Sequence, residues 1–596
     1  MSADICFFLS LAVLLIGFGT AFACHRSPNR RGKIFSPVRC LLVSIFLACV
    51  FLFFPLHLLQ FPKGFWGSFK SLLLAVHSTM RLFVLDGEFD GMAAFTEQLP
   101  QKLQLGYSLL AAALYILAPI FTFGFVLSFF KNISAYRALI FSPASEVYAF
   151  SELNEKALVL AKSIREKKPR SLIVFTDVFE NNEETIFELC EKARALHAVW
   201  FRKDIADINW KYRSMSSQIY LFTIGEDQSE NVEQSIRLLH TYEKCSNFHL
   251  FVFSSSAESQ VLFNAVREGG MYVRRIDPIR SLISQMLYRN GYALFEHAIS
   301  TESTRLISVV IIGLGQYGKE LLKALPWFCQ MDGYQVQIHA FDRDLQAESK
   351  FRMACPELLD PEKNGTYVAG EAQYSITIHS GVDVDTAEFA DSLRSIGPIS
   401  CIFVALGEDG RNIQSALTAR MLCARNGQHP QIQAIVYNSL KKKALETITD
   451  YRGHPYDITF IGDLENSYAE DVIIDSELEQ NAIRRHLKWG KELEFWAYEF
   501  NYRSSIAAAI HEKMRVLCGI PGAGKRAEEL SPAERIGLEQ LEHRRWNAYM
   551  RSEGYVFSGS TAPESRNDLA KLHHDLVPFE LLSQEEKQKD LMMSTK

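Results

Sequence analysis

The sequence predicts an α-helical membrane domain, then α/β domains with two tandem Rossmann-type units, then a small, mostly α-helical domain. Three observations predict this order: the first part is apolar and rich in Phe and Leu, the middle alternates β-rich runs with amphipathic helical stretches, and the last part has helical periodicity. The 596 residues are 48% hydrophobic and carry a net charge of −6. Because nucleic-acid binders usually have a clustered basic surface, we expect no direct DNA binding.

Three runs in residues 1–134 are long and apolar enough to cross a bilayer: 5–24, 41–61 and 106–130. No basic residue precedes the first run and a basic cluster follows it, which favours a membrane anchor over a signal peptide. That basic cluster also predicts a cytoplasmic loop between the first two spans. We therefore expect a multi-pass protein of the cell inner membrane, in contact with the lipid bilayer, whose chain after residue 131 is cytoplasmic.

The segment 65–85 is apolar but contains three cationic or titratable residues. Lys70, His77 and Arg81 are seven and four positions apart, so they share one face of a helix. Such a face is costly in lipid. The segment is either an amphipathic helix at the outer interface or a helix that lines a pore or interface in an oligomer, and the sequence leaves both open.

A glycine motif marks the clearest α/β unit, predicted to span residues 301–485. A buried apolar run leads into Gly313, Gly315 and Gly318, and an amphipathic helix follows at once. Asp342 ends the next β-rich run, 24 residues after Gly318, where a carboxylate would meet a ribose hydroxyl. The glycines let a pyrophosphate approach the helix N-terminus. The alternative is a tight turn kept for packing without a ligand.

Further strands are expected at 375–381, 401–407, 432–438 and 458–463. With the glycine motif, these residues resemble the RCK or TrkA-N family, the nucleotide-sensing regulatory domains of potassium channels and transporters. The resemblance implies a ligand-responsive domain that assembles through paired units and binds NAD(H), ATP or a cyclic nucleotide. The predicted nucleotide-binding residues are Gly313, Gly315, Gln316, Tyr317, Gly318, Asp342, Arg343, Gly381, Leu406, Gly407 and Asn412.

Residues 135–300 repeat this layout in degraded form. The run Gly225-Glu226-Asp227 matches Gly407-Glu408-Asp409 after similar β-rich runs, but the segment Phe150–Glu155 has no glycine where the motif is expected. We interpret this first copy as a structural or dimer-forming unit, with a different ligand as the alternative. Tandem units of this kind predict a homo-oligomer, either a dimer or a tetramer.

The carboxyl-terminal part, residues 486–596, is predicted to be helical. The run Leu541–Trp546, then Gly554-Tyr555, then His573–Phe579 resemble the bacterial form of the ryanodine-receptor repeat (RyR) domain, although tyrosine stands at 555 where tryptophan is commoner. The resemblance implies a small ligand-recognition module, which in bacteria accompanies membrane segments and nucleotide-signalled defence. The alternative is that Trp546 packs in a small core beside an ion pair. The predicted pocket residues are Tyr502, Arg503, Glu542, Arg545, Trp546 and Tyr555.

Two other patterns predict no catalytic or metal site. Gly519–Lys525 matches GxxxxGK, but Arg526 follows where Ser or Thr should hold magnesium, and a helical stretch precedes it, so we expect a loop between helices. The 11 cysteines contain no CxxC pair, so no metal site is predicted.

Together these features predict a ligand-gated membrane effector or ion channel that responds to a nucleotide signal, with a role in bacterial anti-phage defence and without enzymatic activity. No potassium selectivity sequence of the TVGYG kind is present, so ion selectivity is left open. One alternative is a membrane-tethered NAD(P)-dependent oxidoreductase, for which His379 is the candidate base. Another is a regulatory subunit of a separate transporter.

Overall fold

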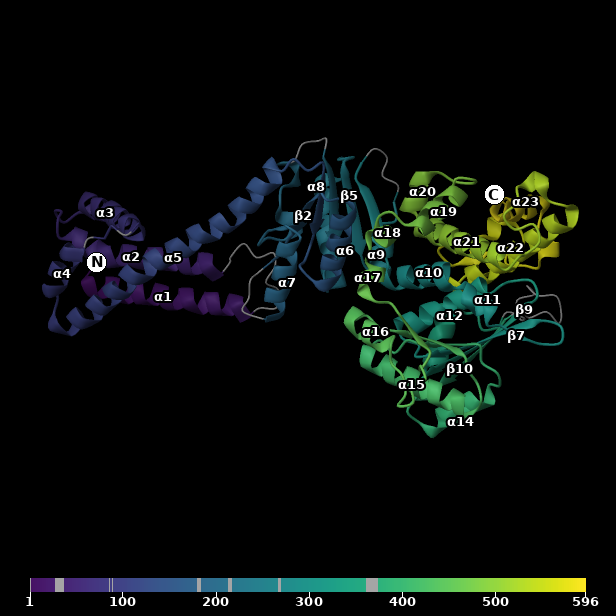
Figure 1. Cartoon of the computed structure of the whole chain (residues 1–596). Coiled ribbons are helices and arrows are strands. Elements are labelled where there is room, and N and C mark those ends of the chain that lie inside the picture. Colours follow the sequence, from purple (N-terminus) through teal and green to yellow (C-terminus); the bar gives the residue numbers. More distant parts are fainter. Residues whose placement is uncertain are drawn as a thin grey trace. The chain divides into compact units, whose positions relative to one another are not determined.

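The computed structural model describes residues 2–26, 37–84, 86–87, 89–178, 184–212, 217–265, 270–360 and 374–595. The chain forms two compact units, Met1–Ala138 and Leu139–Lys596. The helices of the first are α1 (Ala3–Arg26), α2 (Pro37–Leu58), α3 (Phe65–Phe83), α4 (Phe89–Glu97) and α5 (Gln101–Phe141), of which α5 runs on into the second (Figure 1).

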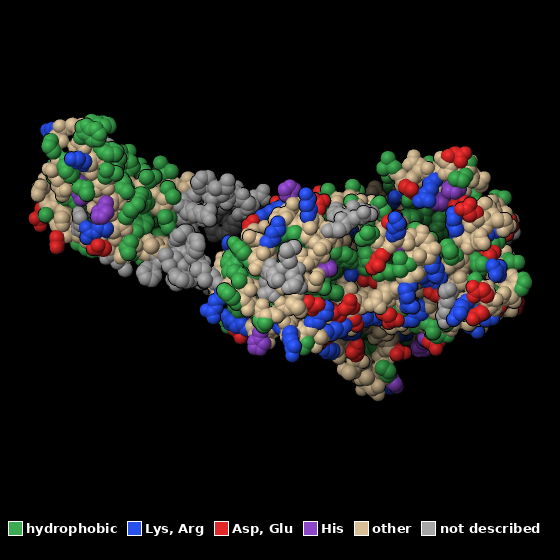
Figure 2. All heavy atoms as spheres, turned by 90° about the horizontal axis from the view of Figure 1, so that it is seen from above, with side chains coloured by type: hydrophobic (Ala, Val, Ile, Leu, Met, Phe, Trp, Pro, Cys, Tyr) green, Lys and Arg blue, Asp and Glu red, His purple; other side chains and the backbone are tan. Residues whose placement is uncertain are grey.

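The three apolar runs expected from the sequence are helices long enough to span a membrane. The spanning windows are Ala3–Thr20 in α1, Leu41–Leu58 in α2 and Gln101–Thr122 in α5. Figure 2 shows apolar side chains gathered on the surface of this unit. The length and composition of these helices fit a membrane-anchored protein.

Helix α3 packs with its small residues inward. Gly67, Ser71 and Ala75 are buried, whereas Phe65 and Trp66 are 78% and 71% exposed. Small residues let helices approach closely within a membrane, so the large outward side chains are left for lipid or a partner. The pattern fits a helix held against α2, with which α3 shares an extensive contact.

The three residues predicted for a pore or interface all lie on α3. Lys70 and His77 are exposed. Arg81 donates hydrogen bonds to both carboxylate oxygens of Asp86, at 3.0 and 3.1 Å. This ion pair reduces the charge that Arg81 can present to a pore, whereas Lys70 and His77 are exposed.

The first α/β sheet has six parallel strands in the order β3-β2-β1-β4-β5-β6. The strands are β1 (Glu146–Phe150), β2 (Leu172–Phe175), β3 (Val199–Trp200), β4 (Gln218–Thr223), β5 (Phe248–Phe253) and β6 (Tyr272–Ile276). The helices between them are α6 (Glu155–Lys167), α7 (Glu184–Ala195), α8 (Gln228–Tyr242) and α9 (Ala257–Leu262). Order and direction are those of a Rossmann-like fold.

The second sheet repeats this order as β10-β9-β8-β11-β12-β13, again parallel, with β7 added antiparallel to β8. Its strands are β7 (Ile299–Ser300), β8 (Arg305–Ile312), β9 (Tyr334–Asp342), β10 (Tyr374–Ser380), β11 (Cys401–Val404), β12 (Gln431–Ile435) and β13 (Ile458–Ile461). Its helices are α12 (Gln316–Phe328), α13 (Ala347–Ala354), α14 (Ala387–Ser395), α15 (Asp409–Arg425) and α16 (Ser439–Leu445). The predicted Rossmann-like parallel fold is confirmed.

The segment that follows each sheet packs on the other sheet. After β6, α10 (Pro278–Asn290) and α11 (Tyr292–Glu296) join the hydrophobic core of the second sheet. After β13, α17 (Leu464–Ser467) and α18 (Glu470–Ile473) pack on α6 of the first. The hydrophobic core at each sheet therefore contains residues from the segment that follows the other sheet, and this exchange stabilises the two sheets together.

The carboxyl-terminal region is mostly helical, as predicted. Its helices are α19 (Glu477–His486), α20 (Glu492–Ala497), α21 (Glu499–Leu517), α22 (Pro532–Ser552) and α23 (Gln584–Ser594), with a short pair of strands, β14 (Val556–Phe557) and β15 (Leu572–His573). Ser531 and Glu534 form a capping box at the start of α22. The run Gly519–Lys525 is a turn between α21 and α22, and Lys525 pairs with Glu534 at 2.6 Å.

Candidate functional site

Two glycines of the motif are required by the backbone of the loop between β8 and α12. Gly313 has φ +94°, and an added Cβ would lie 2.8 Å from the carbonyl oxygen of Ala405. At Gly318 an added Cβ would lie 1.8 Å from the carbonyl oxygen of Gly313. At Gly315, by contrast, the nearest atom to an added Cβ is 3.9 Å away. Its side-chain space is therefore open to a ligand.

Asp342, at the end of β9, braces this loop. One of its carboxylate oxygens accepts a hydrogen bond from the backbone N–H of Leu314 at 2.6 Å, and the other accepts from Asp344 at 2.8 Å. Each carboxylate oxygen keeps a second acceptor direction. Asp342 therefore has a structural role in addition to the ribose contact predicted from the sequence.

A cavity of 280 Å³ lies over the loop, and two arginines line it. Arg343 follows β9 directly, and Arg411 lies in the first turn of α15. Neither side chain has a hydrogen bond or ion pair to another described residue. No side chain caps the start of α12, whose N-cap is Gly315. Unpaired guanidinium groups beside an uncapped helix N-terminus form a cradle for a phosphate.

The sequence predicted only part of this cavity. Of the predicted residues, those that line it are Gly313, Gly315, Asp342, Arg343 and Leu406. Arg411 and Asp383 line it too and were missed. Arg411 is two positions after Asp409, in the turn at the carboxyl end of a parallel strand, and that position is the signal that could have identified it.

A second cavity, of 550 Å³, continues from the first and shares Gly315 and Leu406 with it. The predicted residues Gln316, Tyr317 and Gly407 line this cavity rather than the first. Tyr437 and Tyr468 also line it, and so do Lys156, Gln228 and Ser255 of the first copy. The degenerate copy therefore contributes to the surroundings of the glycine loop.

Besides Gly318, two of the predicted nucleotide-binding residues line neither cavity, Asn412 and Gly381. Asn412 is fully buried; its amide oxygen accepts from Leu406 N–H at 2.6 Å and its amide nitrogen donates to the Ile435 carbonyl at 2.9 Å. Gly381 has φ +81° and turns the chain after β10 beside Leu345. Both residues shape the loops around the site.

In the first copy, an acidic side chain lies where the second copy has its glycine loop. Glu152 is in the turn between β1 and α6, and its carboxylate accepts a hydrogen bond from the backbone N–H of Glu226 at 2.9 Å. Because this carboxylate places a negative charge at the turn, it would repel a phosphate there. The contact supports a structural role for the first copy.

The buried asparagine that ties the next turn is repeated as well. Asn231 accepts from the N–H of Gly225 as Asn412 accepts from Leu406, so these two backbone positions are equivalent. The sequence match of Gly225 with Gly407 is therefore out of register by one residue.

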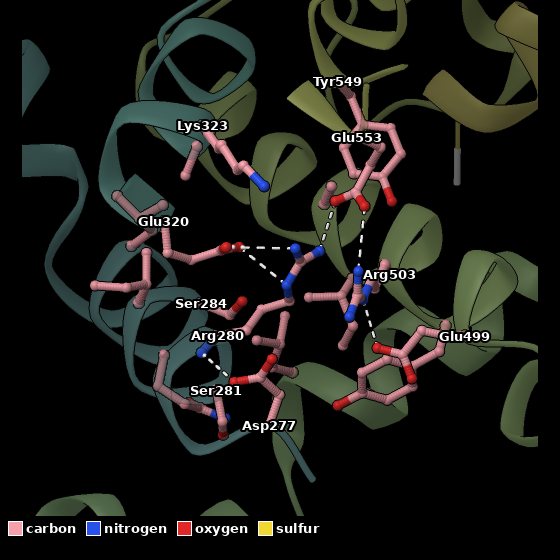
Figure 3. A pocket seen from close by; sticks show the side chains of 18 of the residues that line it. Asp277, Arg280, Ser281, Ser284, Glu320, Lys323, Glu499, Arg503, Tyr549 and Glu553 are labelled. Carbon is pink, nitrogen blue, oxygen red and sulfur yellow. Dashed lines mark hydrogen bonds and ion pairs between the residues drawn. The ribbon is translucent and has the colours of Figure 1, made fainter. Parts of the chain in front are cut away.

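A buried network of ion pairs joins the glycine-motif helix to the carboxyl-terminal helices (Figure 3). Arg280 on α10 contacts Glu320 of α12 at 2.9 Å and Glu553, just after α22, at 2.5 Å. Arg503 on α21 contacts Glu553 at 3.2 Å. The cavity between them is 60 Å³, well below the roughly 300 Å³ of a typical ligand pocket. Its arginines and glutamates are paired with each other, so we assign it a structural role.

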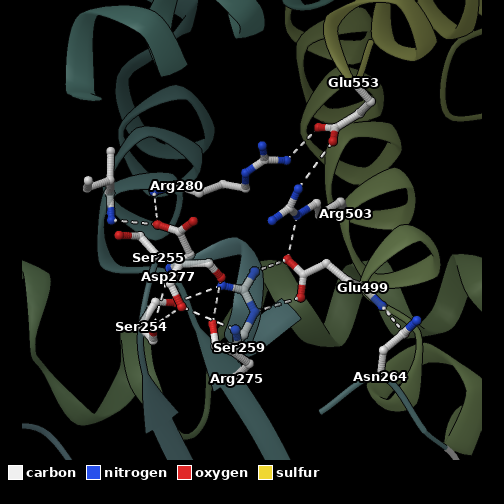
Figure 4. Close-up of polar contacts among 12 residues, drawn as sticks. Ser254, Ser255, Ser259, Asn264, Arg275, Asp277, Arg280, Glu499, Arg503 and Glu553 are labelled. Atoms are coloured by element: carbon white, nitrogen blue, oxygen red, sulfur yellow. Dashed lines mark hydrogen bonds and ion pairs between the residues drawn. The ribbon is translucent and has the colours of Figure 1, made fainter. Parts of the chain in front are cut away.

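The same network reaches the first sheet (Figure 4). Arg275 at the end of β6 pairs with Glu499 of α21 at 2.5 Å, and Glu499 also pairs with Arg503. The network thus connects β6, α10, α12, α21 and the end of α22.

The network predicts that the Leu139–Lys596 unit is sensitive to acid. Burial opposes ionisation of Glu553, but Arg280 and Arg503 outweigh it and hold the pKa of this carboxyl well below 4.5. Burial also opposes ionisation of Glu499, but the charges of Arg503 and Arg275 outweigh the effect of burial and lower the pKa of this carboxyl. Carboxyls whose pKa is lower in the folded state add stability that is lost as pH falls through that lower pKa. We expect the melting temperature to fall progressively below about pH 4.5. A melting temperature that is constant from about pH 7 to about pH 3 would contradict this.

The residues predicted for a pocket in the carboxyl-terminal region are divided between different places. Glu542, Arg545 and Trp546 line a cavity of 760 Å³, which we call the α22–α23 cavity. Tyr502 and Arg503 line the 60 Å³ cavity instead. The remaining residue, Tyr555, packs its ring on Phe500 and donates to Asp568 at 3.3 Å.

His573, His574 and Asp575 lie in the α22–α23 cavity close enough to suggest a metal site. The two imidazole rings are nearly parallel, at 6° with centroids 4.9 Å apart. Because a nitrogen lone pair lies in the plane of its ring, parallel stacked rings cannot direct two lone pairs at one ion. The Asp575 N–H also donates to His573 Nδ1 at 3.2 Å. This arrangement does not form a metal site.

Neither a family model nor a curated protein matches this chain. Among solved structures, it matches the crystal structure of Anabaena Alr3699/HepE in complex with UDP and glucose, with 11% sequence identity and a TM-score of 0.15, over 63% of this chain and 99% of that chain. The RCK and RyR resemblances therefore remain predictions.

That match corrects one expectation from the sequence. The chain was expected not to be an enzyme, and this exclusion is contradicted because the matching structure holds UDP and glucose. A TM-score of 0.15 supports no correspondence of residues or ligands beyond that correction.

The histidine expected to serve an oxidoreductase is held away from the glycine loop. His379 lies on β10, its ring stacks on Phe341 at 4.2 Å, and its Nε2 is 3.2 Å from Nδ1 of His339. Burial lowers the pKa of His379. His379 lines neither cavity at the loop.

Proposed function

We propose that this protein is a membrane-anchored effector that responds to a nucleotide, whose phosphates bind over the glycine loop of the second sheet. One observation carries the proposal: Arg343 and Arg411, both without partners among the described residues, line a cavity above the open position of Gly315. Each guanidinium can donate two parallel hydrogen bonds to a phosphate, and the loop can add backbone N–H groups.

In the finer form of the proposal, the α/β units act as RCK-like sensors in a homo-oligomer on the cytoplasmic side of an inner membrane, and nucleotide binding opens or assembles a pathway through the bilayer. The ligand would be NAD(H), ATP or a cyclic nucleotide, and the setting bacterial anti-phage defence. A ligand shifts such an equilibrium only through different affinities for the two states. Helix α12 supports the coupling, since it begins at the glycine loop and reaches the ion-pair network through Glu320.

Calorimetry on the full chain in an uncharged detergent tests the binding step. The panel is NAD⁺, NADH, ATP and a cyclic dinucleotide. We expect Gly315→Asp to weaken binding of the active nucleotide by about 100-fold, because the new carboxylate fills the phosphate approach with a like charge.

The control for this substitution is Gly537→Asp on α22, where nothing lies within 4 Å of an added Cβ. It should leave nucleotide affinity unchanged. Equal affinities in the wild type and Gly315→Asp, or no binding of any nucleotide in the panel, would refute the proposed site.

A further inference from the structure

The α22–α23 cavity has the size and walls of a small-molecule site. Its 760 Å³ lies within the roughly 300–1,000 Å³ range of ligand pockets. Trp546 and Phe500 give it aromatic walls, and Trp489, 45% exposed, stands at its margin. The ring of His573 meets Trp546 edge to face at 4.9 Å, which fixes the indole. Aromatic walls with polar groups on one side are typical of such sites.

Acidic side chains outnumber basic ones around this cavity. The lining includes three Lys or Arg side chains and five carboxylates, which are Glu542, Asp575, Glu585, Glu586 and Asp590. Of the basic residues, Arg566 is paired with Asp568, which does not line the cavity, at 3.0 Å. Arg545 is taken by Glu542, at 2.7 Å. Lys589 is the remaining basic residue of the lining for the other four carboxylates. It already pairs with Glu586 at 2.6 Å and with Glu585 at 3.5 Å.

Asp575 and Asp590 are the acids least compensated by cations. Within the described residues their ion-pair partners are histidines: His574 at 3.3 Å and His573 at 3.9 Å for Asp575, and His543 at 3.3 Å for Asp590. Burial raises the pKa of both carboxyls; the charge of Glu586 adds to this at Asp575, and that of Glu542 adds to it at Asp590. The neighbouring His573 adds no positive charge, because burial lowers its pKa to about 3.

We propose that the α22–α23 cavity binds a small organic cation, an ammonium group on an apolar or aromatic body. The ammonium lies between the Trp546 ring and the carboxylates of Asp575 and Asp590, and the body lies against Phe500. An aromatic face attracts a cation most strongly when the site is shielded from water, and ionised carboxylates strengthen that attraction. A phosphate does not fit this lining, because its charge has the same sign as the carboxylates. This inference does not depend on nucleotide binding at the glycine loop.

The test compares two aromatic probes of similar size and opposite charge, phenyltrimethylammonium and phenyl phosphate. Binding to the full chain in an uncharged detergent is followed by calorimetry and by tryptophan fluorescence. We expect the cation to bind at least about tenfold more tightly than the phosphate, and both Asp575→Asn and Trp546→Phe to weaken it by about tenfold.

The matched control is Glu564→Gln, which removes one carboxylate from the exposed surface of the same region, outside the cavity. It should leave affinity for the cation unchanged. A melting curve for each variant separates lost binding from lost folding, and a second acidic variant, Asp590→Asn, replaces Asp575→Asn if the latter does not fold. Preference for phenyl phosphate, absence of cation binding, or equal weakening by Glu564→Gln would overturn the proposal.

Discussion

Replacing Glu553 with glutamine is expected to lower the free energy of unfolding of the Leu139–Lys596 unit by about 3–5 kcal/mol. Among the described residues, Glu553 is the one carboxylate that contacts both Arg280 and Arg503, and all three side chains are at least four-fifths buried. Without Glu553, Arg280 keeps only Glu320 and Arg503 keeps only Glu499 as a described ion-pair partner, so two positive charges lose a shared partner in a region of low dielectric constant. The loss should therefore be much larger than for a surface ion pair, which is worth about 0–1 kcal/mol.

Thermal and denaturant unfolding of the full chain in detergent measure this loss. The control is Glu580→Gln, an exposed carboxylate in the same region. A midpoint for Glu553→Gln that equals the control midpoint would show that the network does not stabilise the fold. The double variant Arg280→Met/Glu553→Gln should recover part of the loss, because it removes one of the two buried arginines that lose Glu553 as a partner.

Replacing Gly318 with alanine is expected to destabilise the second sheet by about 3 kcal/mol and to abolish nucleotide binding. The new Cβ would overlap the Gly313 carbonyl, at 1.8 Å from the oxygen and 2.9 Å from the carbon. Both atoms are backbone, so no side-chain rotation relieves the overlap. The loop must open, and opening it breaks the bond from Leu314 to Asp342.

Gly315→Ala is the matched substitution within the same motif. Its added methyl group meets nothing nearer than 3.9 Å, so we expect an unchanged melting temperature and about tenfold weaker nucleotide binding. Melting curves and calorimetry on the two variants separate the structural glycine from the ligand-facing one. Equal melting temperatures for Gly318→Ala and the wild type would contradict the packing argument.

Much of the fold could be predicted because local patterns determined it. Uncharged runs near 20 residues gave the spans, and a buried β run leading into Gly313 gave the strand, turn and helix in order. The capping box of Ser531 and Glu534 was equally local. In each case the residues that decide the structure are neighbours along the chain.

The features that could not be predicted depend on residues far apart in sequence. Arg280 meets Glu553 across 273 positions, and nothing in either segment indicates the other. The packing of α10 on the second sheet and of α17 on the first likewise has no indication in the local sequence. Arg503 was expected near Trp546, but its position four residues after Glu499 on α21 turns it toward the ion-pair network.

The site was predicted in outline rather than in detail. The glycines and Asp342 follow a known spacing. Asn412, by contrast, was expected to contact the ligand, but its side-chain amide instead forms two hydrogen bonds with the backbone. Glu152 was not predicted to occupy the turn of the first copy. Its contact with the backbone N–H of Glu226 depends on the fold, which brings together residues 74 positions apart.

The most direct test of the central claim is ion or dye flux from vesicles that contain the purified full chain. We expect that the nucleotide found by calorimetry, added to the side facing the soluble part, changes flux in the wild type and in Gly537→Asp but not in Gly315→Asp. Flux that stays the same while the nucleotide is bound would contradict the claim that the glycine loop controls events in the membrane.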